Sequence, residues 1–272
     1  MIVHLNYVFI KKLIFFQLCF FFFLLTSPLH SELLKNDKFS FSNKLLNVNV
    51  GLSTVSAPKY EGSSKSVSRI MPFLNLKYKN ITFNPVMGLN INFLDNEDWL
   101  LGYGLGFNFG KDPESDVNLK GLKKVNSTFE PKLKAKYKNK YYSITSEISY
   151  DLLKRGHKGA YLKTSFNTGF PLIKLKTFII PSFSFTYADK TYLNNFFGVD
   201  VGENLSSGYS KYNLKSGIKN ISASLMVIYN LNDRISINSN LIYKKLVGQV
   251  ANSPLVSKSD SLSTIFSIVY KY

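Results

Sequence analysis

The sequence contains very little cysteine and histidine. Its one cysteine, Cys19, lies near the N-terminus, and only three histidines are spread over 272 residues. Disulfides within the chain are therefore excluded, and strand pairing and burial must hold its fold together. Acidic side chains are also few: 17 stand against 34 basic ones, which gives a formal net charge of +17.

The N-terminal segment has the organisation of a secretory signal peptide. Two lysines precede an apolar run over residues 13–25, which Thr-Ser-Pro at 26–28 ends. A helix of that length reaches about 20 Å, short of the roughly 30 Å hydrocarbon core of a bilayer, so a cleaved leader is predicted rather than an anchor. We expect residues 1–31 to be removed and residues 32–272 to form one domain. Cys19 lies inside the run rather than at its end, which argues against lipidation.

Beyond the leader, no run of eighteen apolar residues occurs, so no spanning helix is expected. Large and small side chains alternate instead. In residues 99–109 all odd positions carry large apolar side chains, while the even positions carry Gly102, Gly104, Gly106 and Asn108 after Leu100. A strand places these two sets on opposite faces. The same alternation occurs in eleven segments, at 46–52, 67–78, 81–93, 99–109, 129–137, 142–150, 160–170, 175–187, 221–229, 235–243 and 262–272.

Two further features favour an outer-membrane β-barrel over a soluble β-sandwich, in which strands also alternate. Short turns alternate with long polar loops at 56–66, 110–124, 188–212 and 247–260, as periplasmic and extracellular connections do in such barrels. Tyrosines gather at strand ends beside the short turns, where rings with one wet end suit the lipid headgroup level. These are Tyr78, Tyr137, Tyr141, Tyr142, Tyr229 and Tyr272. The predicted location is the outer membrane of a Gram-negative cell.

The strand count needs one correction to reach an even number, which single-chain bacterial barrels require. Either a bend at Asn84-Pro85 divides the segment 81–93, or residues 205–217 supply a further strand. We therefore predict an all-β, antiparallel up-and-down barrel of twelve strands, with ten strands as the alternative.

The last strand also carries the pattern of an assembly signal. Phe266, Ile268, Tyr270 and Tyr272 share one face, with an aromatic residue at the terminus. This pattern is typical of the C-terminal signal that the barrel assembly machinery reads, although a last lipid-facing strand has the same requirement. We expect that machinery, outer-membrane lipid and lipopolysaccharide as partners.

Several short segments, in order along nearly the whole mature chain, resemble the MipA/OmpV family of MltA-interacting scaffolding proteins and OmpV-type outer-membrane proteins. They are Ala-Pro-Lys-Tyr-Glu-Gly-Ser at 57–63, Gly-Tyr-Gly-Leu-Gly at 102–106, Phe-Gly-Lys-Asp at 109–112, Leu-Lys-Gly-Leu at 119–122, His-Lys-Gly at 157–159, Phe-Gly-Val at 197–199 and Asn-Ser-Pro-Leu-Val at 252–256. The chain departs from the family in charge, because lysines stand where acidic, arginine-containing loops are expected.

The resemblance implies an outer-membrane barrel. For some relatives it implies a scaffold that joins a lytic transglycosylase to a peptidoglycan-synthesising penicillin-binding protein, and for others porin-like or adhesion-linked behaviour. A scaffold without enzymatic activity, cofactor or metal is the leading hypothesis for this chain, and a small porin-like channel with weak anion preference is the alternative.

A lipid-modifying barrel enzyme is the third hypothesis. Such enzymes need a histidine paired with a serine nucleophile, and after cleavage of the leader only His157 remains. Its neighbours, Lys-Arg-Gly before it and Lys-Gly after it, predict a flexible basic loop that serves as a surface or partner contact. Neither the glycines at 102–106 nor the acids at 95–98 and 112–116 have the spacing of a phosphate loop or a catalytic carboxylate pair, and a polar loop is favoured over a weak cation site at 112–116.

The basic residues suggest where an anion could bind. Lys132, Lys134 and Lys136 recur at a spacing of two and so share the inward face of one strand, and Lys163 and Lys176 are candidates to join them. Like charges at such positions repel, so they need water, acids such as Glu130 and Glu147, or an anionic guest. Because lysines are scattered among apolar positions, nucleic acid is not expected as a partner; a compositional bias of the genome is a further explanation of the charge.

Overall fold

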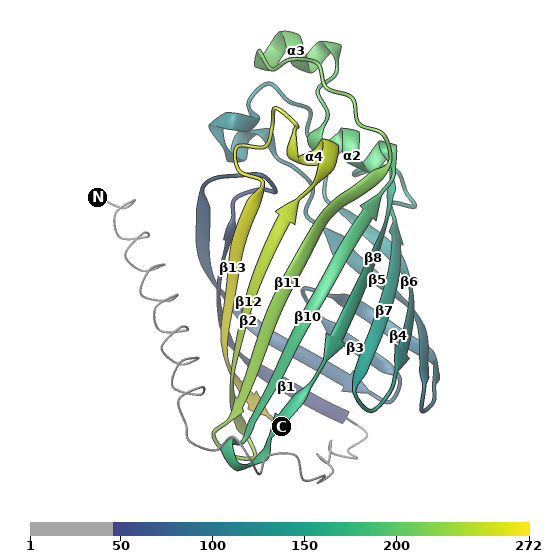
Figure 1. Ribbon diagram of the computed structural model, residues 1–272, viewed down its shortest axis with the longest axis vertical. Coiled ribbons are helices and arrows are strands. Elements are labelled where there is room, and N and C mark those ends of the chain that lie inside the picture. Colours follow the sequence, from purple (N-terminus) through teal and green to yellow (C-terminus); the bar gives the residue numbers. More distant parts are fainter. Residues whose placement is uncertain (1–45) are drawn as a thin grey trace, which may run out of the picture.

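The computed structural model describes residues 46–272, so the predicted leader and its cleavage site lie outside the described residues. Thirteen strand segments form one antiparallel sheet that closes on itself (Figure 1). They are β1 (Leu46–Pro58), β2 (Ser66–Tyr78), β3 (Ile81–Asn84), β4 (Gly88–Asp95), β5 (Trp99–Asn108), β6 (Thr128–Lys138), β7 (Tyr142–Tyr150), β8 (Ala160–Thr168), β9 (Phe170–Leu172), β10 (Thr177–Ala188), β11 (Gly217–Asn230), β12 (Ile235–Leu246) and β13 (Asp260–Lys271).

The barrel has twelve strands, as predicted. β13 pairs with β1, from Lys271 opposite Asn49 to Thr264 opposite Ser56, and this pairing closes the wall. β8 and β9 both pair with β10 and are separated only by Gly169, so together they form one strand of the wall. Closure leaves no free lateral edge on β1 or β13, which a lipid environment requires.

The extra strand comes from the bend at Asn84-Pro85. Asn84 Oδ1 accepts hydrogen bonds from the backbone N–H groups of Val86 and Met87, and Gly88 follows with a φ of 84°. This turn separates β3 from β4. The other option, a strand within 205–217, is wrong, because this segment holds the end of a helix and a loop in which Tyr212 alone bridges to Val199.

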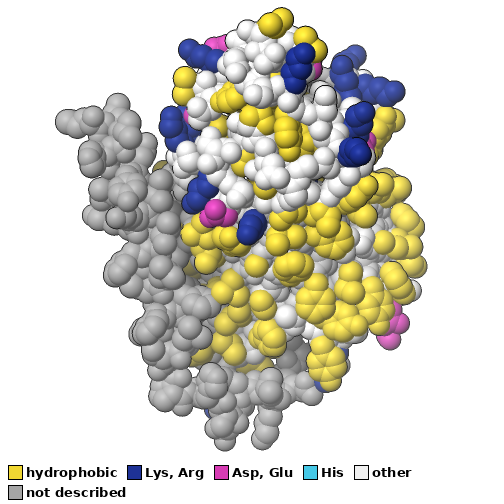
Figure 2. All heavy atoms as spheres, turned by 45° about the horizontal axis from the view of Figure 1, so that its top comes forward, with side chains coloured by type: hydrophobic (Ala, Val, Ile, Leu, Met, Phe, Trp, Pro, Cys, Tyr) yellow, Lys and Arg dark blue, Asp and Glu magenta, His cyan; other side chains and the backbone are white. Residues whose placement is uncertain are grey.

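The strands are apolar outside and polar inside. Leu52 is 65% exposed on the outer face of β1, whereas its neighbour Ser53 is 5% exposed and its hydroxyl lies 2.7 Å from that of Ser267 across the seam. A soluble sheet buries its apolar face, so this inverted arrangement fits a lipid surround. Figure 2 shows the apolar side chains gathered around the wall, beneath a top rich in lysine and arginine.

Asparagine side chains cap short turns at the end of the barrel where the C-terminus lies. Asn96, Asn139 and Asn232 each accept two backbone N–H groups within their own turns. These Asx turns fix the backbone locally. The predicted girdle lies beside them: the rings of Trp99, Tyr137, Tyr142 and Phe166 follow one another across β5 to β8 with centroids 5.2, 6.2 and 5.4 Å apart. Short turns mark this end as periplasmic.

The opposite end carries the long connections, which are folded rather than merely polar. They contain the 3-10 helices η1 (Pro113–Ser115) and η2 (Val117–Leu119) and the helices α2 (Lys190–Phe197), α3 (Val201–Ser207) and α4 (Gly248–Ala251); a further 3-10 helix, η3 (Ile173–Leu175), lies in a periplasmic turn. Within residues 46–272, none of the helices has the length and apolar character that crossing a membrane requires.

The wall is much lower between β2 and β5 than elsewhere. β3 has four residues and β4 eight, whereas β10 to β13 have twelve to fourteen. β2 pairs with β3 only from Leu76 to Tyr78, and Asn84 at the hairpin tip donates a hydrogen bond to Leu74 O. Above that level, residues 66–75 of β2 pair with β1 alone. On this side, strands cover less of the height of the barrel, so the extracellular loops are more important for closing it.

Candidate functional site

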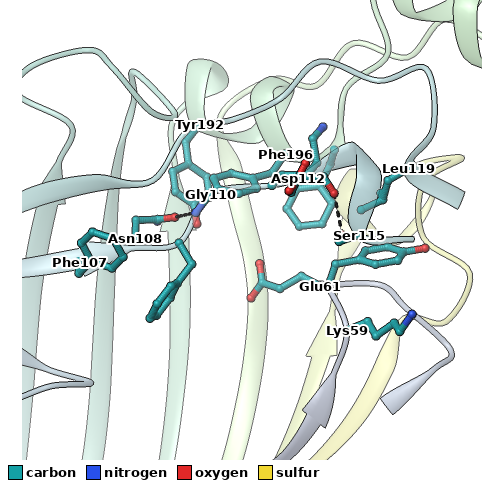
Figure 3. Close-up of a pocket in the computed structure, with 14 residues that line it drawn as sticks. Lys59, Glu61, Phe107, Asn108, Gly110, Asp112, Ser115, Leu119, Tyr192 and Phe196 are labelled. Carbon is teal, nitrogen blue, oxygen red and sulfur yellow. Dashed lines mark hydrogen bonds between the residues drawn. The ribbon is translucent and has the colours of Figure 1, made fainter. Parts of the chain in front are cut away.

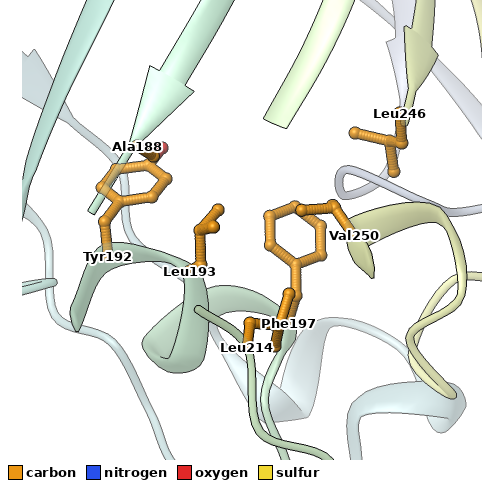
Figure 4. Packing of buried hydrophobic residues seen from close by; sticks show 7 residues of the cluster. All are labelled: Ala188, Tyr192, Leu193, Phe197, Leu214, Leu246 and Val250. Carbon is orange, nitrogen blue, oxygen red and sulfur yellow. The ribbon is translucent and has the colours of Figure 1, made fainter. Parts of the chain in front are cut away.

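The candidate site is the extracellular mouth of the barrel, where loops and helices form a plug. Its centre is a cluster of buried apolar side chains from β10, α2, β12, α4 and the loop before β11 (Figure 4). The cluster consists of Ala188, Tyr192, Leu193, Phe197, Leu214, Leu246 and Val250. Each fully buried side chain of leucine size contributes roughly 1.5–3 kcal/mol. The plug is thus held as the core of a soluble domain is held.

Helix α2 is positioned by its first turn. Asp189 caps the helix, since its Oδ1 accepts the N–H of Tyr192 at 2.7 Å, and its Oδ2 accepts the N–H of Ala160 on β8 at 2.9 Å. The C-terminal end is tied to the last loop, because Ser253 Oγ donates to Phe197 O at 2.6 Å. The segment 188–212, predicted as a polar loop, contains a helix signal. It is a capping aspartate followed by apolar residues at helical spacing, namely Tyr192, Leu193, Phe196 and Phe197.

A second apolar cluster joins three different loops. Leu119, Leu122, Val199 and Leu255 come from the connections after β5, β10 and β12. Glu203 adds a polar link, because it closes the capping box of α3 with Asp200 and also accepts the N–H of Lys123. These contacts make one folded unit of segments that are far apart in the chain.

Beneath α2, a buried histidine and a buried glutamate form the polar centre of the site. His157 is 0% and Glu130 1% exposed, and His157 Nε2 lies 2.6 Å from Glu130 Oε1. Glu130 also accepts hydrogen bonds from Asn108 Nδ2 and Tyr161 OH, both at 2.8 Å. The backbone N–H of Gly159 donates to His157 Nδ1, so the Nε2 nitrogen carries the proton shared with Glu130.

The loop that carries His157 is ordered by Asp151. This carboxylate is fully buried and accepts the N–H groups of Gly156 and Lys158 as well as the hydroxyl of Thr128. Burial tends to raise the pKa of Asp151, but these hydrogen bonds lower it below the ordinary value. The prediction that His157 lies in a flexible surface loop is therefore wrong: the glycine-rich segment folds back into the barrel mouth, where Asn195 Nδ2 binds His157 O.

Glu61 links the first loop to the wall through two lysines. Lys219 Nζ on β11 lies 3.0 Å from one carboxylate oxygen and Lys244 Nζ on β12 lies 2.9 Å from the other. Lys219 also lies 5.1 Å from the centroid of the Tyr192 ring. Burial tends to raise the pKa of Glu61, but the two ammonium groups lower it far below its ordinary range. The carboxylate is thus held ionised at the lower face of the plug.

A cavity of about 330 Å³ lies within the plug (Figure 3). Its walls combine aromatic with polar and charged side chains, and Glu61 points into it from one side while Tyr192 and Phe196 of α2 line another. Lys111 also lines it; among the described residues its ammonium group has no hydrogen-bond partner, and burial lowers its pKa. The cavity lies between the β1–β2 loop and the end of β5, and β2 and β5 are the strands that flank the low side of the wall.

The predicted lumen lysines lie in two places. Lys132, Lys134 and Lys136 share the face of β6 that carries the buried Glu130, opposite the exposed Phe129 and Leu133. Lys163 stands opposite Glu147 in the β7–β8 register, and Lys132 Nζ lies 3.1 Å from Glu147 Oε1. Lys176 lies instead in the periplasmic turn, as the left-handed cap of η3, where its carbonyl accepts the N–H of Asn230.

The remaining candidates occupy ordinary structural positions. Of the C-terminal pattern, Ile268 and Tyr270 of β13 are 54% and 38% exposed, Tyr272 just after β13 is 78% exposed, and Phe266 is partly buried. Asp112 and Asp116 cap η1 and η2, and Asp116 pairs with Lys59. Within residues 46–272, no three histidine, cysteine or acidic side chains are grouped as a metal site requires.

Comparisons with known proteins identify the family. A family model described as MltA-interacting protein MipA matches residues 50–272. The chain belongs to this family. It is 26% identical over 204 residues to outer membrane protein OmpV of Vibrio cholerae serotype O1, a match that covers 73% of this chain and 77% of that protein. MipA-family membership and the barrel together make the chain an outer-membrane protein.

Solved structures similar to this member of the MipA family include a porin and an outer membrane protein. The NanC porin shares 12% identity, covers 84% of this chain and 100% of its own, and has a TM-score of 0.41. OmpT of Vibrio cholerae shares 9% identity, with coverage of 89% and 100% and a TM-score of 0.37.

Proposed function

We propose that this protein is a non-enzymatic scaffold of the outer membrane whose barrel is closed at its extracellular end. The observation that carries the proposal is the plug, in which two apolar clusters and the Glu130–His157 pair join the long loops inside the mouth. An open porin leaves its lumen continuous with water. A mouth packed with buried leucine and phenylalanine side chains favours binding over conduction.

The plug also argues against the lipid-modifying enzyme. A histidine that activates a serine must accept the hydroxyl proton on a free ring nitrogen. In His157, Nδ1 accepts from Gly159 and Nε2 is bonded to Glu130, so both ring nitrogens are engaged. The geometry therefore supports a structural role for this pair.

The partner we propose follows from the family description, which names an MltA-interacting protein. A lytic transglycosylase acting on murein, together with a peptidoglycan-synthesising penicillin-binding protein, would meet this barrel from the periplasmic side. The turns at that end are short and capped by asparagines, so they present a stiff surface whose ordering costs little entropy on binding. Leu231, 45% exposed in the β11–β12 turn, is an apolar contact on that surface.

Affinity capture from detergent-solubilised envelopes tests this proposal. We expect the full-length chain to retain murein hydrolases and synthases, and Leu231→Lys to retain at least several-fold less. The matched control is Leu205→Lys, which changes an 82% exposed leucine on α3 at the opposite end. Equal retention by both variants would remove the periplasmic turns from the proposal, and no enrichment of murein enzymes by the unaltered chain would remove the scaffold itself.

The inward lysines favour the second candidate, an anion-leaning channel. Planar-bilayer recordings separate the two. A closed barrel gives no steady conductance until the segment 190–214 is deleted, whereas a channel conducts with the segment in place. Steady anion-selective conductance of the unaltered chain would replace the scaffold by the channel.

A further inference from the structure

Lysines at inward positions of the wall, at or below the plug, include Lys132, Lys134 and Lys136 on β6, Lys163 on β8, Lys219 on β11 and Lys244 on β12. Three carboxylates accompany them, of which Glu130 is engaged by His157 and Glu61 by Lys219 and Lys244. The third, Glu147, stands beside Lys132, Lys134 and Lys163, whereas Asp95 pairs with Lys138 at the periplasmic end of β6. Positive charge is therefore in excess in this part of the barrel.

The strand register places Glu147 between two lysines, and a third lysine forms an ion pair with it. It stands opposite Lys134 on β6 and opposite Lys163 on β8. Its Oε1 lies 3.1 Å from Lys132 Nζ, and that lysine side chain is 13% exposed. Lys134 and Lys163 make no hydrogen bond or ion pair with any residue that the structure describes.

Glycine at 106 makes room for Lys132. A Cβ atom there would lie 2.1 Å from Lys132 Cε and 2.8 Å from its Nζ, so the lysine side chain lies directly over this glycine. With Gly102 and Gly104 at the next inward positions of β5, no side chain from that strand fills the space beside Lys132 and Lys134. The alternating glycines thus leave the lysine row without a neighbouring side chain from β5, and the uncharged Asn90 and Asn92 of β4 lie next to Gly104 and Gly102.

One carboxylate does not balance three ammonium groups. Glu147 attracts Lys132, Lys134 and Lys163, but the lysines repel one another, and Lys219 and Lys244 add to the repulsion on Lys163 from the side of the plug. Water screens part of the repulsion, but low-dielectric walls focus the remaining potential inside a barrel. An anion with more than one charged group would relieve several of these repulsions at once.

We propose that the lumen below the plug is a binding site for a small anion with two or more carboxylate or phosphate groups, held by Lys132, Lys134 and Lys163. The ligand enters from the periplasmic mouth, because the plug occupies the other end. The direction of entry rests on the closed barrel of the proposed function, whereas the binding site itself rests only on the register and the charges. Because the lumen is closed at its extracellular end, the barrel binds such an anion but does not conduct it across the membrane.

Calorimetric titration of the full chain in detergent at low salt tests the site, with citrate as the carboxylate probe and pyrophosphate as the phosphate probe. We expect binding of at least one probe, weakened about three- to tenfold by Lys163→Gln or Lys134→Gln and by added salt. Glu147→Gln removes the one competing carboxylate and should tighten binding by a similar factor. The control is Lys245→Gln, which removes an exposed charge next to Lys244 on the opposite face of β12.

The probes decide the headgroup chemistry: citrate alone indicates a carboxylated ligand, pyrophosphate alone a phosphorylated one, and both a site selective for charge only. Each supports the site if the variants follow the expected order. Failure of both probes to bind, or equal affinities of Lys163→Gln, Glu147→Gln and the unaltered chain, would overturn it. Neither result depends on the capture of murein enzymes, so this inference and the proposed function can fail separately.

Discussion

The plug and the wall of this barrel follow opposite rules for placing apolar residues. In the plug, Leu193 is 0% and Phe197 1% exposed, as in the core of a soluble domain. On the wall, Leu133 is 61% and Ile70 73% exposed, because lipid replaces the protein interior as the apolar phase. One chain thus contains two apolar regions: an outer belt on the wall that lipid covers, and a small core in the plug that other side chains of the protein cover.

The wall and the plug also differ in the contacts that hold them in place. The wall is fixed by strand pairing, which runs around the whole barrel at its periplasmic end. The plug is joined to it by a few identifiable contacts, chiefly Glu61 with its two lysines and Glu130 with His157. Substitutions in the plug, in the wall and at their junction should therefore change the stability of the barrel and the closure of the plug by different amounts.

The largest effect is expected for Glu130→Ala. It leaves His157, Tyr161 and Asn108 without the acceptor that all three share, and removing one partner of a buried charged network costs about 5 kcal/mol at the upper end. Urea unfolding in lipid vesicles, followed through the single tryptophan, Trp99, measures this loss. Glu130→Gln keeps an acceptor oxygen and should lose less.

The matched control is Glu147→Gln. Its carboxylate also pairs with an inward lysine, but it is 25% exposed and lies in the wetter part of the lumen, so we expect less than about 1 kcal/mol. Comparable losses of unfolding free energy for the two variants would show that the Glu130–His157 pair is not a principal contact between the plug and the wall.

The next effect compares the same truncation in the two apolar regions. Leu193→Ala in α2 removes apolar contact and leaves a cavity, and should cost the plug about 4 kcal/mol. Leu133→Ala on β6 leaves no cavity, because lipid fills the space, and should cost about 2 kcal/mol. Opening of the plug is measured as new conductance in planar bilayers. Conductance from Leu133→Ala, or none from Leu193→Ala, would contradict the distinction.

These two apolar regions were not equally visible in the sequence. The wall could be predicted strand by strand, because a period of two acts over short distances and lipid imposes it on each strand, as at Leu52 and Ser53. Even the twelfth strand was signalled by Asn84-Pro85. The plug could not be predicted, because Leu193, Leu214 and Val250 meet from three segments that share no local period. His157 was misjudged for the same reason: its partner Glu130 is 27 residues away and has no sequence mark of its own.

A smaller effect should come from the hairpin that lowers the wall. Gly88 has a φ of 84°, and a Cβ atom there would lie 2.0 Å from Leu105 O, so Gly88→Ala should cost about 2–3 kcal/mol. Gly208→Ala is the control, since it has a similar φ of 77° but no heavy atom within 4 Å, and should cost about 1 kcal/mol. The same vesicle unfolding assay compares them, and equal costs would mean that the tip of β3–β4 is not tightly packed.

The smallest effect is the response of the plug to mild acid. The two lysines hold the pKa of Glu61 far below its ordinary range, so the carboxylate contributes stability that is present above its unfolded-state pKa and is lost only as the pH falls through the lowered folded-state value. Lowering the pH from about 7 to 5, above the ordinary glutamate range, should therefore leave the plug closed and the bilayer conductance unchanged. Lys219→Met removes one ammonium group while burial still favours the neutral acid, so the pKa of Glu61 should rise and acid should now open the plug. Acid opening of the unaltered chain in that range would show that closure of the plug depends on another titratable contact and not on Glu61 alone.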